Sequence, residues 1–502
     1  MGWTLPARPS LYPLGLLLAL GFPFPAFAAP VEISASVAGP VYGNSSDANG
    51  LSQPINTQLA EGHSVAIKNG GVVTTGDVYG ARAADSSGTV TAKSNTVTIS
   101  GTVTSGDVYG AYATGGTAPR STDNTVTISS GMVGGSIYGG YTTTGSADDN
   151  KVNISGGTVS GNIYGGYASS GTGSATTNKV TISTSGATYK AIYGGAPNGT
   201  GDLFTGNTLN LAAGNSIFSV QNFETINFTS AGVAGIDMLD TAPTGASGLV
   251  KLNTNSYEIT FSGPITSSAV GSGGINKQGA GKLILSGTND YDGGTTVSDG
   301  TLQLGNGTGA GSIAGNIYTN SASANVTFNH STTVPYDGVI SGNGSLTQAG
   351  VGRLILSGEN TYTGDTTVES EMQVTGTGKL GTGGSYAGKI INNGTLLFTQ
   401  TVAQTLSGVI SGSGALTQNS DTGVTLTLSG MNTYRGETTI STGTLALSGS
   451  GSIANSSGVS LADDPSAIFD ISAVNSGTMT TINGLTGGDI YGGNVTLGIV
   501  TK

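Results

Sequence analysis

Internal repetition is the feature that most constrains the fold of this 502-residue chain. Sequence repeats with periods of about 20–50 residues are typical of solenoids and related arrays. Two short motifs alternate through the first half of the chain. Asn-x-Val-x-Ile begins at Asn95, Asn124, Asn150, Asn178 and, as a variant, Asn207. Val/Ile-Tyr-Gly contains Tyr79, Tyr109, Tyr138, Tyr164 and Tyr193.

Each Asn-x-Val-x-Ile motif alternates apolar and polar residues, as a half-buried strand does. Val97 and Ile99 fall on one side of such a strand, and Thr96 and Thr98 on the other. If each repeat is one coil, strands of successive coils pair in parallel about 4.8 Å apart. The asparagines then form a ladder of side-chain amides, and the tyrosines form an aromatic column. The pattern predicts an all-β, right-handed, single-stranded parallel β-helix.

A second array recurs at a longer interval, from Leu285 to Leu356 and then to Leu428. Its motif is Leu-Ser-Gly-x-Asn-x-Tyr, followed by Thr-Thr-Val or Thr-Thr-Ile. The recurring pairs are Asn289 with Tyr291, Asn360 with Tyr362, and Asn432 with Tyr434. This interval exceeds one coil, so we expect each unit to span three coils of about 20–25 residues each.

This second motif resembles the autotransporter-associated β-strand repeat of Gram-negative passenger domains. The resemblance covers residues 273–450 in three copies, and the middle copy departs from it at Ser370-Glu371-Met372, where the others have Gly-Thr-Leu. It implies a right-handed parallel β-helix carried through the outer membrane by a C-terminal β-barrel translocator. It also accounts for the absence of cysteine, because a disulfide-closed loop would obstruct a narrow pore.

The chain begins with a segment that is typical of a secretory signal peptide. Residues 1–28 contain a leucine-rich centre and end in the small-x-small sequence Ala26-Phe27-Ala28. A membrane anchor is the alternative, but the apolar run is shorter than the roughly 20 residues that a spanning helix needs. We expect export across the inner membrane to the cell surface or beyond, or to the periplasm if no translocator is supplied.

No segment shows the alternating strands that a C-terminal barrel requires. The last residues, including the sequence Gly488–Gly493, are instead typical of the start of another coil. We interpret the chain as a passenger that lacks its translocator through truncation, a frameshift or a split gene. A separate exported protein is the alternative.

These patterns divide the chain into five segments. The first array follows the signal peptide, and a less regular junction with Pro243 and Pro264 separates it from the second array. The predicted segments are 1–28, 29–211, 212–272, 273–470 and 471–502, the last being a truncated further coil.

Composition excludes several classes of protein. The chain has 87 Gly, no Cys and only 9% charged residues, with a net charge of −12. Scarce helix formers argue against a helical bundle, and thinly spread basic residues argue against nucleic acid as a partner. The absence of Cys excludes thiol nucleophiles and cysteine-based zinc sites.

Candidate catalytic groups are few. The two histidines, His63 and His330, belong to no zinc motif, and we interpret both as ordinary solvated residues. Positions two residues before the first-array tyrosines vary and favour a tolerant surface position: Asp77, Asp107, Ser136, Asn162 and Ala191. Two acidic pairs, Asp148-Asp149 and Asp463-Asp464, are typical of solvated turns. We therefore expect no catalytic residue, metal or cofactor.

A second set of tyrosines recurs at Tyr112, Tyr141 and Tyr167. These side chains either form an exposed strip for a glycan or partner, or pack on the flank of the coils. The sequence favours a non-enzymatic surface passenger, an adhesin or display stalk, with a host-cell glycan or surface protein as its partner. The alternative is a secreted carbohydrate-active β-helix, a polysaccharide lyase or hydrolase, which needs several carboxylates in one groove.

Overall fold

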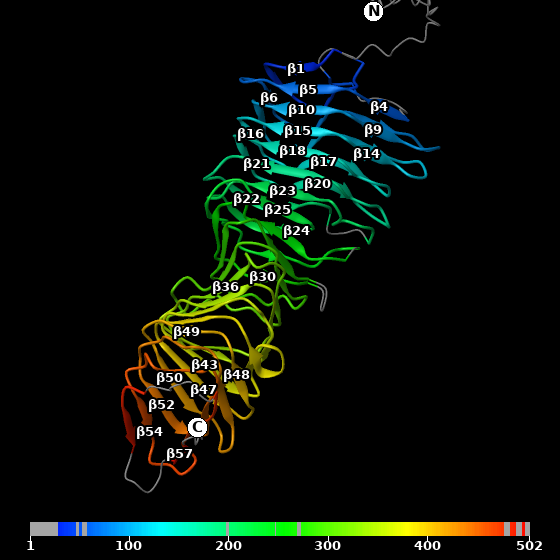
Figure 1. The fold of residues 1–502 in the computed structure, drawn as a ribbon. Coiled ribbons are helices and arrows are strands. Elements are labelled where there is room, and N and C mark those ends of the chain that lie inside the picture. Colours follow the sequence, from blue (N-terminus) through cyan, green and yellow to red (C-terminus); the bar gives the residue numbers. More distant parts are fainter. Residues whose placement is uncertain are drawn as a thin grey trace, which may run out of the picture.

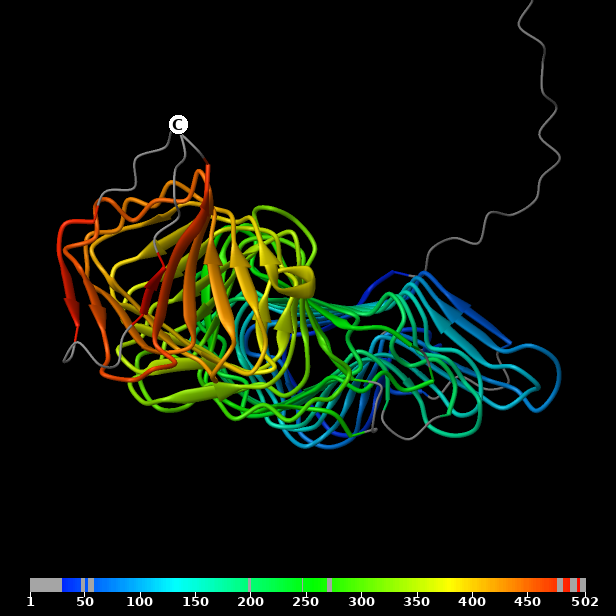
Figure 2. The same cartoon turned by 60° about the horizontal axis from the view of Figure 1, so that its bottom comes forward.

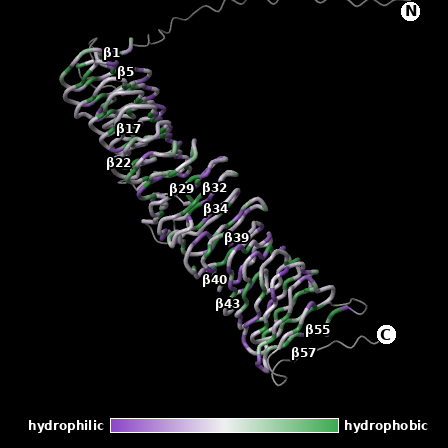
Figure 3. The backbone as a smooth tube through the Cα atoms, turned by 90° about the vertical axis from the view of Figure 1, so that its left-hand side faces the viewer, coloured by the Kyte–Doolittle hydropathy of each residue, from purple (hydrophilic) through white to green (hydrophobic). Residues whose placement is uncertain are grey.

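The computed structural model describes residues 29–46, 50–52, 58–196, 200–245, 247–268, 273–475, 482–487 and 494–496. The predicted signal peptide and the sequence 488–493 lie outside these residues. The described chain winds into one elongated stack with the N-terminal coils at one end and the C-terminal coils at the other (Figures 1 and 3). Strands of neighbouring coils pair in parallel, as β10 (Thr96–Ile99) does with β15 (Thr125–Ile128). The prediction of an all-β parallel β-helix is confirmed.

Three faces run along the stack, and the first is formed by sheet A and its continuations. Sheet A has 13 strands: β1 (Val31–Ile33), β5 (Ser64–Ile67), β10, β15, β18 (Lys151–Ile154), β21 (Lys179–Ile182), β23 (Thr208–Leu211), β25 (Thr225–Phe228), β28 (Val250–Asn253), β31 (Ile275–Gln278), β33 (Thr295–Val297), β35 (Ile317–Thr319) and β38 (Ile340–Gly342). Sheets G and H continue this face: β41 (Glu359–Asn360), β44 (Lys379–Leu380), β45 (Ser385–Tyr386), β48 (Gln404–Leu406), β51 (Thr425–Leu428), β53 (Thr444–Gly449), β55 (Ile468–Val474) and β57 (Asn494–Thr496).

The second face consists of sheet B in the early coils and sheet E in the later ones. Sheet B contains β2 (Ser36–Val37), β6 (Val72–Val73), β11 (Thr102–Val103), β16 (Met132–Val133) and β19 (Thr158–Val159). Sheet E contains β26 (Gly232–Val233), β29 (Glu258–Phe261), β32 (Lys282–Leu285), β34 (Thr301–Leu304), β36 (Asn325–Phe328), β39 (Ser345–Gln348), β42 (Thr366–Val368), β46 (Ile390–Asn392) and β49 (Ile410–Ser411).

The third face consists of sheet C followed by sheet F. Sheet C contains β3 (Val41–Tyr42), β7 (Val78–Tyr79), β8 (Arg82–Ala84), β12 (Val108–Tyr109), β13 (Tyr112–Thr114), β17 (Ile137–Thr142), β20 (Ile163–Ala168), β22 (Thr188–Tyr193), β24 (Ser216–Gln221), β27 (Leu239–Asp240) and β30 (Ile265–Thr266). Sheet F contains β37 (Val334–Tyr336), β40 (Arg353–Leu356), β43 (Glu371–Gly376), β47 (Thr395–Gln400), β50 (Ala415–Asn419), β52 (Thr438–Thr442), β54 (Val459–Leu461) and β56 (Leu485–Gly487).

The early coils also carry a side lobe beside the main stack, visible as a row of projecting loops in Figure 2. Its strands are β4 (Leu59–Glu61), β9 (Thr91–Lys93) and β14 (Arg120–Thr122). A separate core of small side chains fills it: Ala60, Ala81, Ala83, Val90, Ala92, Ala111 and Ala113. Small residues allow the two layers of the lobe to approach closely.

Alternation along each strand builds the main core. Val97 and Ile99 are fully buried, whereas Thr96 and Thr98 face outward. Each buried Val, Ile or Leu stabilises the fold by about 1.5–3 kcal/mol. One coil alone buries too little to offset its conformational entropy, so stability comes from contact between neighbouring coils.

At two surface positions, side chains of opposite charge pair between neighbouring coils. Glu258 and Lys282 are register partners, as are Arg353 and Glu371. Their charged atoms lie 3.0 Å and 2.8 Å apart. Because equivalent residues stack at the spacing of paired strands, this pairing avoids columns of like charge at these positions.

The repeating unit of the second array is longer than three coils. Leu283 pairs with Leu302 in the next coil, Leu302 with Val326, and Val326 with Leu346, all on the second face. The chain therefore completes three coils between Leu283 and Leu346. The counterpart of Leu283 in the next copy is not Leu346 but Leu354, which lies further along the chain on the next face. Each unit therefore spans three coils and one additional face.

Successive copies of the motif therefore rotate around the stack. The strand that precedes Leu-Ser-Gly is β32 in sheet E, then β40 in sheet F, then β51 in sheet H. The threonine that follows the motif moves in the same way, from β33 to β42 to β52. Three copies thus place the motif once on each face, and no copy stacks directly on another.

The segment 212–272, which we expected to be an irregular junction, contains strands β24 to β30. Sheet A continues through it without a break from β23 to β31. On the other two faces sheet E begins and sheet C ends within this segment. Between the two arrays, the first face therefore keeps the same sheet, whereas the sheets on the second and third faces change.

Candidate functional site: the asparagine and tyrosine columns

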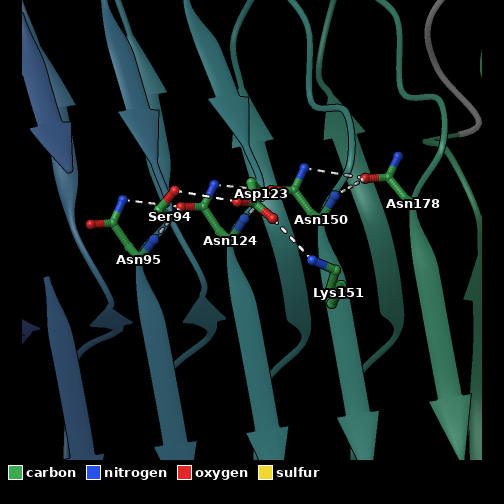
Figure 4. Close-up of polar contacts among 7 residues, drawn as sticks. All are labelled: Ser94, Asn95, Asp123, Asn124, Asn150, Lys151 and Asn178. Carbon is green, nitrogen blue, oxygen red and sulfur yellow. Dashed lines mark hydrogen bonds and ion pairs between the residues drawn. The ribbon is translucent and has the colours of Figure 1, made fainter. Parts of the chain in front are cut away.

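The first-array asparagines form a continuous buried ladder at the start of the sheet A strands (Figure 4). Asn95 Nδ2 donates to Asn124 Oδ1 at 3.0 Å, and Asn124 Nδ2 donates to Asn150 Oδ1 at 2.9 Å. The same bond joins Asn150 to Asn178 and Asn178 to Asn207, each at 3.2 Å. Each acceptor oxygen also receives the backbone N–H of the preceding asparagine, as Asn178 Oδ1 does from Asn150 at 2.9 Å.

The residue before each ladder asparagine adopts a left-handed backbone conformation. Ser94, Asp123, Asp149 and Thr177 have φ between 55° and 60°, and Gly206 has φ of 72°. Non-glycine residues rarely adopt this conformation, which costs roughly 1–2 kcal/mol per residue. The turn directs the following asparagine inward, where its hydrogen bonds hold the strained conformation in place.

His63 occupies the position above Asn95 and heads the ladder. Its backbone N–H donates to Asn95 Oδ1 at 2.9 Å, and Gly62 before it has φ of 71°. The sequence signal for this position is His63-Ser-Val-Ala-Ile67, which parallels the asparagine motif with a different first residue. The His63 side chain is half-buried, and burial lowers the pKa of its imidazole, so this residue is only partly solvated.

The glycines that follow Tyr109, Tyr138, Tyr164 and Tyr193 lie against ladder asparagines. A Cβ atom at Gly139 would be 2.3 Å from the Gly165 carbonyl oxygen and 3.1 Å from Asn150 Cβ. A Cβ atom at Gly165 would be 2.8 Å from Asn178 Cβ. Any larger residue would therefore collide with the asparagine or with the next coil, which explains why the two motifs recur together.

The tyrosines form two parallel columns on the third face. The first column stacks Tyr42, Tyr79, Tyr109, Tyr138, Tyr164 and Tyr193, with ring centroids 4.7–5.0 Å apart. The second stacks Tyr112, Tyr141 and Tyr167, with centroids 4.6 and 5.0 Å apart. Edge-to-face contacts join the columns, and that between Tyr164 and Tyr167 has a centroid distance of 4.9 Å.

The second-column tyrosines therefore pack on the coil flank, although they remain half-buried. Stacking within the column covers ring faces with the neighbouring ring. Side chains three positions apart, such as Tyr109 and Tyr112, make contact because the backbone bends between them. The columns fill the corner between the main stack and the side lobe.

A row of polar side chains binds the first column. Tyr79 donates its hydroxyl hydrogen to Asp77 Oδ2 at 2.9 Å, and Tyr109 donates to Asp107 Oδ2 at 3.3 Å. In a later coil Asn162 Nδ2 donates to Tyr164 Oη at 3.1 Å. Burial, together with the nearby Asp77 charge, raises the pKa of Asp107. Both carboxylates therefore accept a tyrosine hydroxyl hydrogen. Ser136 and Ala191 occupy the equivalent positions in other coils.

The second array uses asparagine and tyrosine differently. Asn289, Asn360 and Asn432 each accept the backbone N–H of an isoleucine in the preceding coil, at 2.8–3.0 Å. The tyrosine two positions later is fully buried in every copy. Its hydroxyl bonds the threonine four positions on: Tyr291 to Thr295, Tyr362 to Thr366 and Tyr434 to Thr438, at 2.6–2.7 Å. Each copy thus forms a corner with an internal Tyr–Thr bond and an asparagine bonded to the preceding coil.

The structure also contains an outer asparagine ladder that our sequence reasoning missed. Asn227 Nδ2 donates to Asn210 Oδ1, and Asn253 Nδ2 donates to Asn227 Oδ1, both at 3.0 Å. These residues are register partners on the outward side of sheet A. The interval from Asn210 to Asn227 is much shorter than that from Asn227 to Asn253, so these asparagines do not form a regular repeat in the sequence.

Lys277 is an unexpected charged group in the core. Its side chain is fully buried, and its Nζ donates to the carbonyl oxygens of Gln278, Gly279 and Asp299 at 3.2, 2.6 and 2.8 Å. Gln348, its counterpart one repeat later, donates through Nε2 to the carbonyl oxygens of Gly350 and Gly352. Lys277 caps the turn from the first face to the second, and Gln348 caps the turn from the second face to the third. Burial lowers the pKa of Lys277 to about 8.

This shift predicts that the stability of the chain depends on pH through Lys277. Between about pH 8 and its unfolded pKa of 10.5, the unfolded chain holds a proton that the folded chain lacks. The free energy of unfolding therefore rises with pH in this window. We expect wild type to gain stability relative to Lys277→Gln between pH 7.5 and 9.5, measured as urea midpoints of both proteins. A constant difference across this range would contradict the assigned pKa.

The remaining candidates for chemistry do not converge. His330 is only 4% exposed, so our interpretation of it as solvated is wrong. Its Nε2 lies 3.2 Å from the Gly311 carbonyl oxygen, and burial lowers its pKa. Asp148 and Asp464 accept hydrogen bonds from nearby serines, Ser174 and Ser466. Among the described residues, no three His, Cys, Asp or Glu side chains group closely enough to hold a metal ion.

No helix in the described part of the chain has the length and apolar character needed to cross a membrane. The helical segment in the described part of the chain is a short 3-10 turn, Thr382–Gly384.

Comparison with known proteins finds two similarities. The passenger-associated-transport-repeat model matches residues 275–304, 346–370 and 425–447, which contain the rotating motif. The chain is also similar to the protein named Adhesin BmaC autotransporter from Brucella suis biovar 1 (strain 1330). The two are 31% identical over 301 residues, which cover 47% of this chain and 8% of the relative. This chain therefore spans under a tenth of that relative. The chain thus contains passenger-associated-transport repeats on a parallel β-helix and is similar to part of an autotransporter adhesin.

Proposed function

We propose that this chain is the non-enzymatic passenger of a surface adhesin, acting as a stiff stalk that touches a host-cell glycan or surface protein. The similar Brucella protein is named an adhesin, which supports this role. As a passenger it would be exported to the cell surface or beyond.

The observation that carries the proposal is the burial of the recurring residues. Tyr291, Tyr362 and Tyr434 are fully buried and bond their own corner threonines. Repetition of these residues therefore maintains the stem and does not create a row of binding or catalytic sites. A partner would contact outward positions instead, among them the exposed parts of the half-buried Tyr112, Tyr141 and Tyr167.

The geometry of the tyrosine columns indicates how such contact would occur. Sugar rings stack on the faces of aromatic side chains, but here neighbouring rings cover each other at 4.6–5.0 Å. A partner would meet ring edges, hydroxyls and the polar row beside them. Contact would then rest on hydrogen bonds distributed along the axis.

Binding to cells tests this function directly. The purified chain from residue 29 onward, coupled to beads, should bind cultured host cells in a saturable way, and free chain should compete. Beads that carry an unrelated acidic protein serve as the control. Binding no higher than that control, to cells and to a glycan array alike, would contradict the proposal. Release of reducing sugar from polysaccharides would support a carbohydrate-active enzyme instead.

A further inference from the structure

The two tyrosine columns bring oxidisable phenol rings next to one another on consecutive coils. In the second column Tyr141 lies between Tyr112 and Tyr167, with centroid distances of 4.6 and 5.0 Å and nearly parallel planes. All three side chains are half-buried and so reach the surface at their edges. Phenols at such distances need only small side-chain rotations to bring their ortho carbons together.

Proton acceptors stand beside the first column, whose rings are in edge contact with the second. Asp77 and Asp107 accept the hydroxyl hydrogens of Tyr79 and Tyr109. Burial raises the pKa of both tyrosines, so these phenols remain protonated at neutral pH. A phenol that loses an electron must also lose this proton, and a bonded carboxylate is positioned to take it. Tyr109 lies in edge contact with Tyr112 and Tyr141, at centroid distances of 5.5 and 5.7 Å.

We propose that the tyrosine columns are a site of oxidative cross-linking, at which Tyr141 couples to Tyr112 or Tyr167 as dityrosine. The oxidant is hydrogen peroxide acting through a peroxidase. Each of two phenols gives up one electron and its hydroxyl proton, and the peroxide is reduced to two molecules of water. The two radicals form one carbon–carbon bond between ortho carbons. Each ortho hydrogen then moves to its own ring oxygen, which restores the phenols.

The bond would join neighbouring coils covalently. Tyr112 and Tyr141 are register partners on β13 and β17, so the chain between them makes one full coil. Closing a loop of this length restricts the unfolded chain, as a disulfide does. This cysteine-free chain would thus acquire a cross-link only after export into an oxidising environment.

Peptide mapping after oxidation tests the proposal. Trypsin cuts after Arg120, Lys151 and Lys179, so Tyr112, Tyr141 and Tyr167 fall in three different peptides. Treating the full chain with horseradish peroxidase and hydrogen peroxide should produce dityrosine fluorescence and cross-linked peptide pairs containing Tyr141. The yield per molecule should not change when the protein is diluted, because the link forms within one chain.

Matched variants separate this reaction from general oxidation. Tyr141→Phe keeps the stacked ring and should lose every link at this position, whereas Tyr318→Phe changes an exposed tyrosine outside the columns and should leave the yield unchanged. Tyr362 and Tyr386 form an internal control, because their centroids lie 5.5 Å apart but both are buried. Links that vanish on dilution, equal links at that buried pair, or no dityrosine at all would each overturn the proposal.

Discussion

Replacing Asn150 by alanine is expected to destabilise the first array by about 3–5 kcal/mol. Asn150 Oδ1 accepts both the backbone N–H and the Nδ2 of Asn124, at 3.1 and 2.9 Å. Its own Nδ2 donates to the Ser121 carbonyl and to Asn178 Oδ1. The substitution removes the side-chain partner of the Asn124 backbone N–H and of the Ser121 carbonyl, and each buried group left unpaired costs about 1–3 kcal/mol. Asn124 Nδ2 and Asn178 Oδ1 each lose one bond and keep others. Urea denaturation, followed by the near-ultraviolet circular dichroism of the tyrosine columns, measures the loss.

Asn153 offers a matched control for this experiment. It lies on the same strand, β18, but its side chain faces outward and is partly exposed. Surface substitutions of this kind usually change stability by less than about 0.5 kcal/mol. Equal effects of Asn150→Ala and Asn153→Ala would show that the ladder contributes no more than the surface does.

Much of the first array could be predicted because its repeat and its coil coincide. Each motif returns once per coil, so the alternation in Val97 and Ile99 places the core and equal side chains meet across coils. Stacking of the asparagines and tyrosines then follows from the spacing of paired strands. The side lobe was missed because its core is mainly alanine, which carries no strong periodic signal.

The second array was harder to predict because its repeat and its coil differ in length. Sequence similarity alone suggests that Asn360 lies over Asn289, yet the extra face per unit separates them around the axis. The register can be known only once every coil length is known. Lys277 was missed for a related reason: an inward lysine contradicts the apolar pattern, and only the turn carbonyls that it caps explain it.

The rotating corner of the second array predicts the other large effect. Tyr362 is fully buried, its ring contacts that of Tyr386, and its hydroxyl bonds Thr366 Oγ1 at 2.6 Å. Truncating a buried aromatic residue to alanine costs about 3–5 kcal/mol, because the surrounding side chains close the cavity only in part. We therefore expect Tyr362→Ala to destabilise the neighbouring coils by this amount. Hydrogen exchange of strands β40 to β46 should accelerate most.

Two further variants divide this effect into its parts. Tyr362→Phe keeps the ring and removes only the hydroxyl, and Thr366 retains its bond to the Tyr386 hydroxyl at 2.7 Å. The expected loss is then about 1 kcal/mol. Tyr318→Ala removes a side chain that is 47% exposed and should change stability by less than about 0.5 kcal/mol. If Tyr362→Ala were as mild as Tyr318→Ala, the recurring tyrosine would not support the corner, and its repetition would require a role at the surface.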